Sequence, residues 1–360
     1  MTNDQPTPES TAPAPHKRRP RYSGKNPVRF EDKYKELNPE QYAETIAKVR
    51  ASGKTPAGQH VPILLPEILE CLAPQPGERA VDCTLGYGGH ATALLKAVQP
   101  RGTLLALDQD PIEIIRTEER LRTNCKPEAL IVKRMNFAGL RGALDEIGWS
   151  EGADVILADL GCSSMQFDNP ARGFSFKHDG PLDMRMNPQR GLSARELLRK
   201  LSATKLQSIL EENADESRSS LIAEAIASTD HATTRSLSTA IRAVLPYRLN
   251  DDERDSAVRR VFQALRIAVN EEFTALESFL RQLPHCLKPG GRVAILTFHS
   301  GEDRRVKHFF RDGLRTGVFS AVNDEVIRPT FQENRDNPRA SPAKLRWARK
   351  TPPPLTVDLP

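Results

Sequence analysis

Three glycines and a nearby aspartate are the residues of this 360-residue chain best placed to bind a ligand. Residues 82–90 read Asp-Cys-Thr-Leu-Gly-Tyr-Gly-Gly-His and lie between a short apolar run and an expected helix. Gly86, Gly88 and Gly89 let the main chain of such a strand–helix turn approach a nucleotide-like ligand closely. The next apolar run ends in Asp108, about 20 residues beyond the turn, where a carboxylate can hold ribose hydroxyls.

Two details of the turn distinguish between nucleotide ligands. A dinucleotide-binding turn has a third glycine, and Ala91 stands where that glycine would be expected. Asp82 lies inside the motif, where its charge would repel a pyrophosphate and attract the cationic amino-acid end of S-adenosylmethionine. The residues therefore favour a methyl donor over a nicotinamide cofactor, and a tight turn without any ligand remains an alternative.

Other polar side chains that could take part in chemistry follow later strands. Asp159 ends the apolar run 154–158, and we expect it to lie near both the donor and the acceptor. The remaining candidates for catalysis are Asp183, Arg185, His299 and Asp303. A histidine at a strand end and an Asp–Arg pair in a loop are often structural, so both interpretations stay open.

Alternating strand and helix patterns predict the fold that positions these residues. We expect strands at 79–81, 102–107, 130–132, 154–158 and 292–297, and helices at 66–72, 91–98, 111–123, 140–147 and 306–310. Ile112, Ile115 and Leu121 should share the apolar side of the third helix. This order is typical of an α/β, Rossmann-like doubly wound parallel sheet, whose ligands bind beyond the carboxyl ends of the strands. The basic segment 337–346 would be a final strand or a phosphate-contacting loop.

The alternation stops between the fourth and fifth strands. Residues 165–190 read as a long polar loop, in which two carboxylates, an arginine and two of the phenylalanines at 167, 174 and 176 could clamp a nucleobase. A helical pattern follows from Ser193, which opens a capping box with Glu196. We therefore expect residues 170–280 to form an inserted helical substrate-recognition domain, and 59–169 with 281–360 to form the sheet domain.

Composition bounds the class of protein. Net charge is +5, hydrophobic residues make up 38%, and no apolar run approaches the length of a membrane span. The five cysteines are scattered without metal-binding spacing, so we expect no metal site and a reducing, cytoplasmic setting. Residues 1–58 hold 11 basic and 7 acidic residues, and 16–29 hold six Lys/Arg and no acid. This proline-rich segment is expected to be a disordered tail, either an arm for RNA phosphates or only solvated, with a short helix over 39–52.

Several motifs together resemble one family, the bacterial cytosine-N4 methyltransferases of small-subunit ribosomal RNA (the RsmH or MraW family). The resemblance runs from His60 to about Arg346. Its motifs are His60-Val61-Pro62, the 82–90 turn, Asp159-Leu160-Gly161 with Ser163-Ser164, Gly173-Phe174-Ser175-Phe176, 180–186, 262–270, Phe298-His299-Ser300 with Glu302-Asp303-Arg304, and Asn337-Pro338-Arg339.

The resemblance implies a class I methyltransferase fold with a helical insertion, S-adenosylmethionine as donor and a cytidine of 16S ribosomal RNA as acceptor. Its pattern of donor contacts falls on Gly88, Gly89, His90, Asp108, Phe137, Asp159 and Gln166. The family usually has a small aliphatic residue where Cys162 stands. The acceptor would be free RNA or the assembled small subunit, no membrane is expected, and a homodimer is left open.

Two rival functions remain at this point. Cytosine-C5 methylation needs a cysteine nucleophile near the end of the fourth strand, and Cys162 occupies such a place. A ribosome assembly factor could keep the pocket and bind RNA without turnover. For N4 methylation, the amine must be held in line with the donor methyl and relieved of a proton, so positioning and fixed dipoles should supply most of the rate.

Overall fold

A seven-stranded sheet organises the residues that the computed structural model describes, 62–227 and 229–353. The strands are β1 (Arg79–Asp82), β2 (Thr103–Asp108), β3 (Leu130–Arg134), β4 (Ala153–Asp159), β5 (Leu287–Thr297), β6 (Phe319–Val322) and β7 (Lys344–Lys350). Their order is β3-β2-β1-β4-β5-β7-β6, with β1 to β5 parallel and β7 antiparallel to both β5 and β6. The predicted α/β class and doubly wound sheet are confirmed.

Helices cover both faces of this sheet, which explains why the middle residues of its central parallel strands are apolar. One face is covered by α3 (Leu65–Leu72), α4 (Gly89–Val98) and α5 (Glu113–Arg122). The opposite face is covered by α6 (Leu140–Glu146), α13 (Glu272–Cys286) and α14 (Ser300–Arg315). Neighbouring strand residues alternate between the two cores: Leu104 packs in the first and Leu105 in the second.

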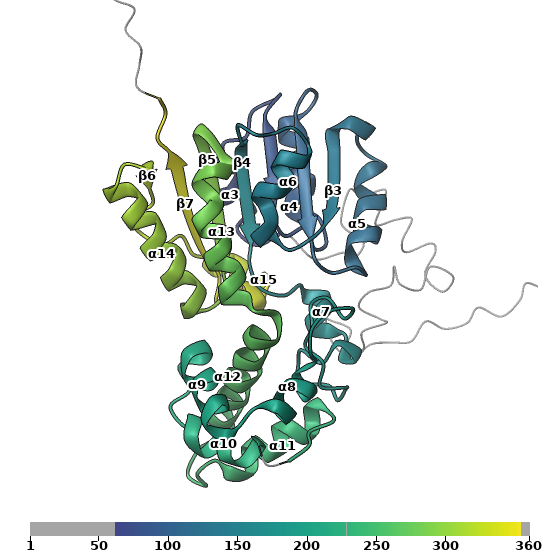
Figure 1. The fold of residues 1–360 in the computed structure, drawn as a ribbon, viewed down its shortest axis with the longest axis vertical. Helices are drawn as coiled ribbons and strands as arrows, with labels where there is room; N and C mark the ends of the chain where they lie inside the picture. The colour runs from purple at the N-terminus through teal and green to yellow at the C-terminus, as the bar shows by residue number, and fades with distance from the viewer. Residues whose placement is uncertain (1–61, 228, 354–360) are drawn as a thin grey trace, which may run out of the picture. The chain divides into compact units, whose positions relative to one another are not determined.

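A second group of helices has a core of its own. It consists of α8 (Ala194–Lys200), α9 (Ala203–Ala214), α10 (Ser219–Ala227), α11 (Thr234–Val244) and α12 (Asp251–Asn270). Figure 1 shows this group beyond the carboxyl ends of β1 to β5. The predicted capping box opens α8: the Ser193 hydroxyl accepts from the Glu196 amide, and the Glu196 carboxylate accepts from the Ser193 amide. After α12 the chain turns at Glu271, and α13 packs on the sheet core, so the separate helical core ends near residue 270.

The expected apolar side of the third helix was wrong. Ile112 and Ile115 are 41% and 58% exposed, whereas Ile114, Thr117 and Leu121 are buried. Because a helix turns about 100° per residue, Ile112 and Leu121 point in opposite directions. The spacing of Ile114, Thr117 and Leu121, three and then four residues, marks the buried face.

The carboxyl-terminal edge of the sheet differs from the sequence expectation in three places. β6 was not predicted, and it is a four-residue edge strand with little pattern of its own. β5 begins five residues earlier than expected, and α14 begins at Ser300 instead of residue 306. The alternative of a final strand is confirmed, because β7 pairs with β5 from Lys344 to Arg349.

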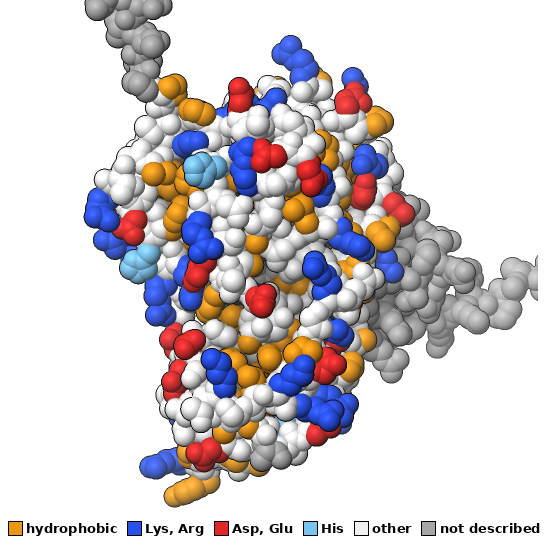
Figure 2. Space-filling view, in the orientation of Figure 1, with side chains coloured by type: hydrophobic (Ala, Val, Ile, Leu, Met, Phe, Trp, Pro, Cys, Tyr) orange, Lys and Arg blue, Asp and Glu red, His pale blue; other side chains and the backbone are white. Residues whose placement is uncertain are grey.

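Predictions for residues 1–58, including the basic run and the helix over 39–52, lie outside the described residues. Among the helices of the described part, none has the length and apolar character to cross a membrane. Figure 2 shows acidic and basic side chains interspersed over one face of the molecule.

The separate helical core yields a stability prediction. Leu265 in α12 is fully buried, so Leu265→Ala should lower the free energy of unfolding by about 2–5 kcal/mol. Leu221 in α10 is 43% exposed and serves as the matched control, with an expected change below about 1 kcal/mol. Urea unfolding followed by circular dichroism measures both. Equal effects of the two substitutions would contradict the burial described here.

Candidate functional site

The glycine turn between β1 and α4 is shaped by its neighbours as much as by any ligand. A Cβ at Gly88 would lie 2.7 Å from the Thr117 methyl, and one at Gly89 would lie 2.5 Å from the Pro62 ring. Gly86 has φ +45°, and a Cβ there would meet only the Thr84 carbonyl, at 3.8 Å. Close packing therefore requires glycine at 88 and 89, and Gly86 is the position that leaves its surroundings open.

Asp108 lies directly beside this turn. One carboxylate oxygen accepts from the Gly86 amide at 2.7 Å, and the other accepts from the Asp110 amide at 2.8 Å. Burial raises the pKa of Asp108 to about 6, although these two amides act in the opposite direction. The turn and the carboxylate thus form one continuous wall at the ends of β1 and β2.

Two more carboxylates follow the central strands. Asp82 ends β1, Asp159 ends the adjacent β4, and Thr84 joins them: its amide donates to Asp82 and its hydroxyl accepts from the Asp159 amide at 2.7 Å. Burial raises the pKa of Asp82 to about 6. One oxygen of Asp82 and one of Asp159 are buried without a hydrogen-bond partner among the described residues. Such groups need a partner, so they mark where a polar ligand group would be received.

His90 is committed to the protein through both ring nitrogens. Nε2 lies 3.0 Å from the Ile63 carbonyl, which can only accept, so this nitrogen carries a proton. Nδ1 lies 3.4 Å from the Asp159 carboxylate. Burial lowers the pKa of His90, but the hydrogen bond and charge of Asp159 and the charge of Asp82 outweigh it and raise the pKa overall. The ring therefore holds Asp159 in place, and the predicted donor contact of His90 stays a prediction.

A buried ion pair joins the wall formed by the glycine turn and Asp108, called the donor-side wall below, to the loop before the helical group. Asp110, fully buried, accepts from Arg172 Nη1 at 2.8 Å and from Gln166 Nε2 at 2.8 Å. The other end of the Arg172 guanidinium donates to the Arg185 and Met186 carbonyls at 3.0 and 2.8 Å. Gln166 also completes a capping box with Ser163, at the start of α7 (Ser164–Asp168). The contacts of Gln166 link Asp110 to the start of α7, and its predicted contact with the methyl donor stays a prediction.

Sequence reasoning missed two acids in this region. Asp110 and Glu113 are buried beside Asp108, and burial raises the pKa of Glu113 to about 7, with the charge of Asp110 adding to the effect. The spacing Asp108-x-Asp110 directly after a buried strand was the available signal. An acid near a helix start is usually solvated, so this spacing alone does not distinguish a buried acid from an exposed one.

Asp183 and Arg185 pair with each other instead of facing the glycine turn. Arg185 donates to both oxygens of Asp183, at 2.8 and 2.7 Å, and this holds the pKa of Asp183 below its usual range despite partial burial. Between them, Met184 has φ +64°, a strained conformation for a residue with a side chain. Asn270 stabilises it by donating to the Met184 carbonyl and accepting from the Met186 amide. Their catalytic roles remain untested.

Three of the four aromatic residues expected around the ligands are buried or partly buried against other side chains. Phe137, in η3 (Phe137–Gly139), packs edge-on against Phe279 with ring centres 5.4 Å apart. Phe174 is buried, and Phe176 packs against Phe262. A buried ring such as Phe174 is not free to stack on a base, whereas Phe176 is partly buried against the helical core, and the nucleobase clamp stays a prediction.

Cys162 contacts a buried network between the two cores. Arg266 of α12 donates to both oxygens of Glu272 at 2.8 Å, and its third nitrogen lies 3.1 Å from the Cys162 sulfur. Burial raises the pKa of the Cys162 thiol to about 11, which the charge of Arg266 only partly opposes. A thiol is a nucleophile only as the thiolate, so this sulfur is poorly suited to covalent attack.

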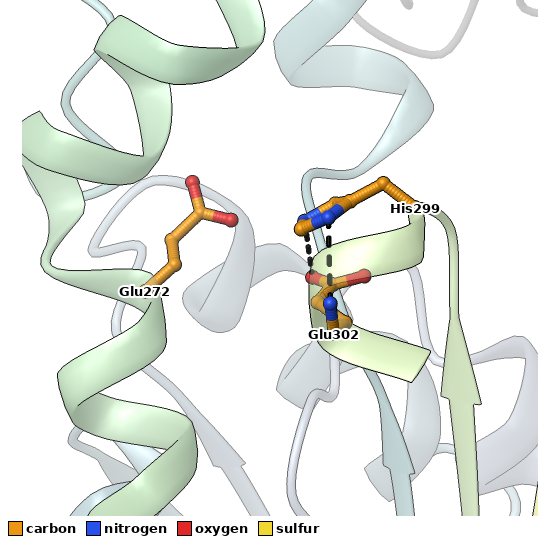
Figure 3. Close-up of side chains that lie close together, drawn as sticks. All are labelled: Glu272, His299 and Glu302. Carbon is orange, nitrogen blue, oxygen red and sulfur yellow. Dashed lines mark hydrogen bonds and ion pairs between the residues drawn. The ribbon is translucent and has the colours of Figure 1, made fainter. Parts of the chain in front are cut away.

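His299 lies in the same network, at the end of β5. Figure 3 shows Glu272 of α13 pointing toward His299 and Glu302 of α14. His299 caps α14, because its Nδ1 accepts from the Glu302 amide, and its Nε2 lies 3.3 Å from the Glu302 carboxylate. Burial alone would raise the pKa of Glu302, but His299 and Arg266 lower it below its usual range.

These three side chains have the composition of a metal site, which the sequence did not predict. Glu272 already shares both oxygens with Arg266, and the guanidinium also lowers the pKa of Glu302. A divalent cation would have to displace this internal positive charge. The arrangement is an ion network that joins the helical core to the sheet.

Asp303 of α14 forms ion pairs with two residues of β7. It accepts from Arg346 Nε at 2.7 Å and from Lys344 at 3.3 Å. Burial would raise its pKa, but the two cations lower it below the usual range. Of the predicted residues, the structure thus brings together Gly88, Gly89, His90, Asp108 and Asp159, and it gives His299 and Asp303 structural contacts elsewhere. All these roles stay predictions.

Comparison with known proteins agrees with this architecture. The model of the MraW methylase family matches residues 57–351. The chain belongs to the MraW methylase family. It is 50% identical over 356 residues to ribosomal RNA small subunit methyltransferase H 1 of Lachnoclostridium phytofermentans, covering 96% of each chain. It is 42% identical to ribosomal RNA small subunit methyltransferase H of Crocosphaera subtropica, over 82% of this chain and 91% of that one.

Among solved structures, a putative rRNA-methylase from Clostridium thermocellum superimposes with a TM-score of 0.39 at 11% identity, covering 81% of this chain and 98% of that one. This similarity is too low to add to the assignment. Membership of the MraW methylase family confirms the resemblance found in the sequence motifs, and it makes the chain a methyltransferase.

The surroundings of Cys162 yield a chemical prediction. With its thiol pKa near 11, the native protein should alkylate at Cys162 about a hundredfold more slowly than free cysteine at neutral pH. Iodoacetamide labelling read by peptide mass spectrometry measures this rate. The protein unfolded in urea is the control and should react at Cys162 as a free thiol does. Fast labelling of the native protein would show a thiolate there.

Proposed function

We propose that this protein transfers a methyl group from S-adenosylmethionine to the exocyclic N4 amine of a cytidine in small-subunit (16S) ribosomal RNA. Family membership and the names of the relatives support ribosomal RNA as acceptor. The choice of the amine rests on one observation: the end of β4 offers a carboxylate, Asp159, and a thiol unsuited to attack, Cys162.

The donor-side wall fits S-adenosylmethionine by charge. When bound there, this group supplies an activated methyl on a positively charged sulfur and adds an ammonium. Asp82 and Asp108 have pKa values raised to about 6 because burial disfavours their charged forms. A cationic ligand would compensate that cost. Asp108 would hold the ribose, and Asp82 with the main chain of the glycine turn would receive the amino-acid end.

The same residues can carry the proton step. N4 of cytosine is a weak nucleophile because its lone pair is delocalised into the ring, so the bond from nitrogen to the methyl carbon forms only if the amine is held in line. As this bond forms and the carbon–sulfur bond breaks, the nitrogen becomes acidic and must lose a proton. The buried oxygen of Asp159 that lacks a partner is our proposed acceptor. His90 acts as a positioning residue that holds the other oxygen.

The donor site should depend on pH in a defined direction. Asp82 would attract the ammonium, and Asp108 would accept from the ribose hydroxyls, most strongly when both are ionised. Donor affinity should therefore be constant above about pH 7 and fall as pH drops through 6. Calorimetric titration should show about a tenfold weakening between about pH 7.5 and about pH 5. Asp82→Asn should bind more weakly and show a flatter profile. An affinity independent of pH in the wild type would count against these carboxylates as the cation site.

Two substitutions separate N4 from C5 chemistry. Asp159→Asn keeps the shape but cannot accept the proton, and it should lose about two or more orders of magnitude in turnover on small-subunit RNA. Cys162→Ala should keep most of the activity. Chromatography of the digested RNA should show N4-methylcytidine. An inactive Cys162→Ala protein or a C5-methylated product would reverse the assignment, and binding of donor and RNA without turnover would indicate an assembly factor.

A further inference from the structure

Two phenylalanines are exposed on segments that border the candidate site. Phe167 in α7 is 38% exposed, and Phe331, the first residue of α15 (Phe331–Asp336), is 84% exposed. Single exposed apolar residues are common and need no explanation. These two rings call for an explanation because both lie on segments that border the candidate site.

The segments that carry the two rings are tied together and to the donor-side wall. Arg339, in η5 (Pro338–Ala340) directly after α15, forms an ion pair with Asp168, the neighbour of Phe167. Glu333 of α15 accepts from the Leu64 amide at 2.8 Å, two residues after Pro62, which packs on Gly89. Figure 1 shows α7 and α15 between the sheet and the helical group, at the carboxyl ends of the strands.

Phe167 is linked through Phe174 to Arg172, which pairs with Asp110. Its ring lies against Phe174, with centres 6.3 Å apart, and the Arg172 guanidinium lies 5.8 Å from the centre of the Phe174 ring. Since Arg172 is fixed by Asp110, the orientation of Phe167 is coupled to the donor-side wall. A rigid aromatic ring loses little entropy on stacking.

Positive charge accompanies the second ring. Arg328 and Arg335 are exposed on either side of Phe331 in the sequence, and neither forms an ion pair within the described part of the chain. Proteins commonly bind single-stranded nucleic acid through aromatic rings and unpaired arginines, because bases stack on the rings and phosphates contact the cations.

The groove between α9, α13 and α14 is a weaker candidate for the same partner. It has a volume of about 730 Å³ and is lined by three arginines and three acids, with Arg304 paired to Asp215 and Arg305 paired to Glu277. A groove whose charges are already balanced offers little attraction to a polyanion.

We propose that Phe167 and Phe331 form a stacking rim that holds the unpaired nucleotides flanking the target cytidine, while Arg328 and Arg335 contact their phosphates. This inference rests on the proposed function and names how its RNA substrate is held. The target base must leave its stack to reach Asp159. Stacking its neighbours on protein rings would keep the strand open beside the site.

The test uses the full chain, S-adenosylmethionine and a small-subunit RNA substrate. Phe331→Ala should raise KM for RNA about tenfold, with kcat and donor affinity changed less than twofold, because the ring contacts only flanking bases. Phe331→Trp should restore KM, and its added emission should be quenched on RNA binding. Tyr247→Ala is the matched control: Tyr247 is 93% exposed in the turn after α11, and its loss should leave KM unchanged.

The outcomes separate this inference from the proposed function. If the wild type methylates no cytidine N4, the proposed function fails whatever Phe331 does. If the wild type is active and Phe331→Ala keeps the wild-type KM, or the tryptophan emission ignores saturating RNA, the stacking rim is wrong and the function stands. An equal rise in KM for Tyr247→Ala would likewise overturn the rim, because the effect would not be local.

Discussion

Negative charge buried at the carboxyl ends of the parallel strands is the constraint on which the rest of the structure depends. Asp82, Asp108, Asp110, Glu113 and Asp159 crowd one end of the sheet. Burial, with the charge of neighbouring acids, raises the pKa of Asp82, Asp108 and Glu113 there. The protein compensates two of them with cations of its own: Asp110 with Arg172, and Asp159 with His90. Asp82 and Asp108 receive main-chain amides, and Asp82 also receives the Thr84 hydroxyl at 3.5 Å, but neither forms an ion pair within the described part of the chain. The uncompensated charge is what a cationic methyl donor would meet.

Pairing of buried acids with arginines also connects the sheet core to the helical core. Arg172 joins Asp110 to the loop that carries Met184, and Asn270 of α12 holds that strained loop from the other side. Arg266 and Glu272 form the second connection, beside Cys162. Breaking one partner of such a buried pair typically costs about 3–5 kcal/mol, so the helical group should be held rather than hinged at these points. The loop that carries Met184 is therefore positioned by a charge buried beside Asp108.

Much of the fold could be predicted because its signals are local. Short apolar runs, glycine turns and the Ser193 capping box specify strands, turns and helix starts within a few residues, and these elements were found nearly at their observed positions. The errors have local reasons too. The phase of α5 was misjudged because Ile112 and Ile115 are apolar without being buried, and β6 was missed because four residues carry too little pattern.

The sequence by itself determined the family, the α/β class and the gathering of Gly88, Gly89, Asp108 and Asp159, because parallel strands bring their carboxyl ends to one edge. Only the tertiary structure decided which polar groups remain available there. Asp183, His299 and Asp303 are chemically able residues that folding pairs with Arg185, Glu302 and Arg346, while Asp159 keeps an oxygen with no hydrogen-bond partner among the described residues. Which of these groups is paired depends on how distant segments meet in the fold. Arg346 reaches Asp303 from 43 positions away, and Glu333 reaches the Leu64 amide from 269 positions away, and no local pattern encodes such distances.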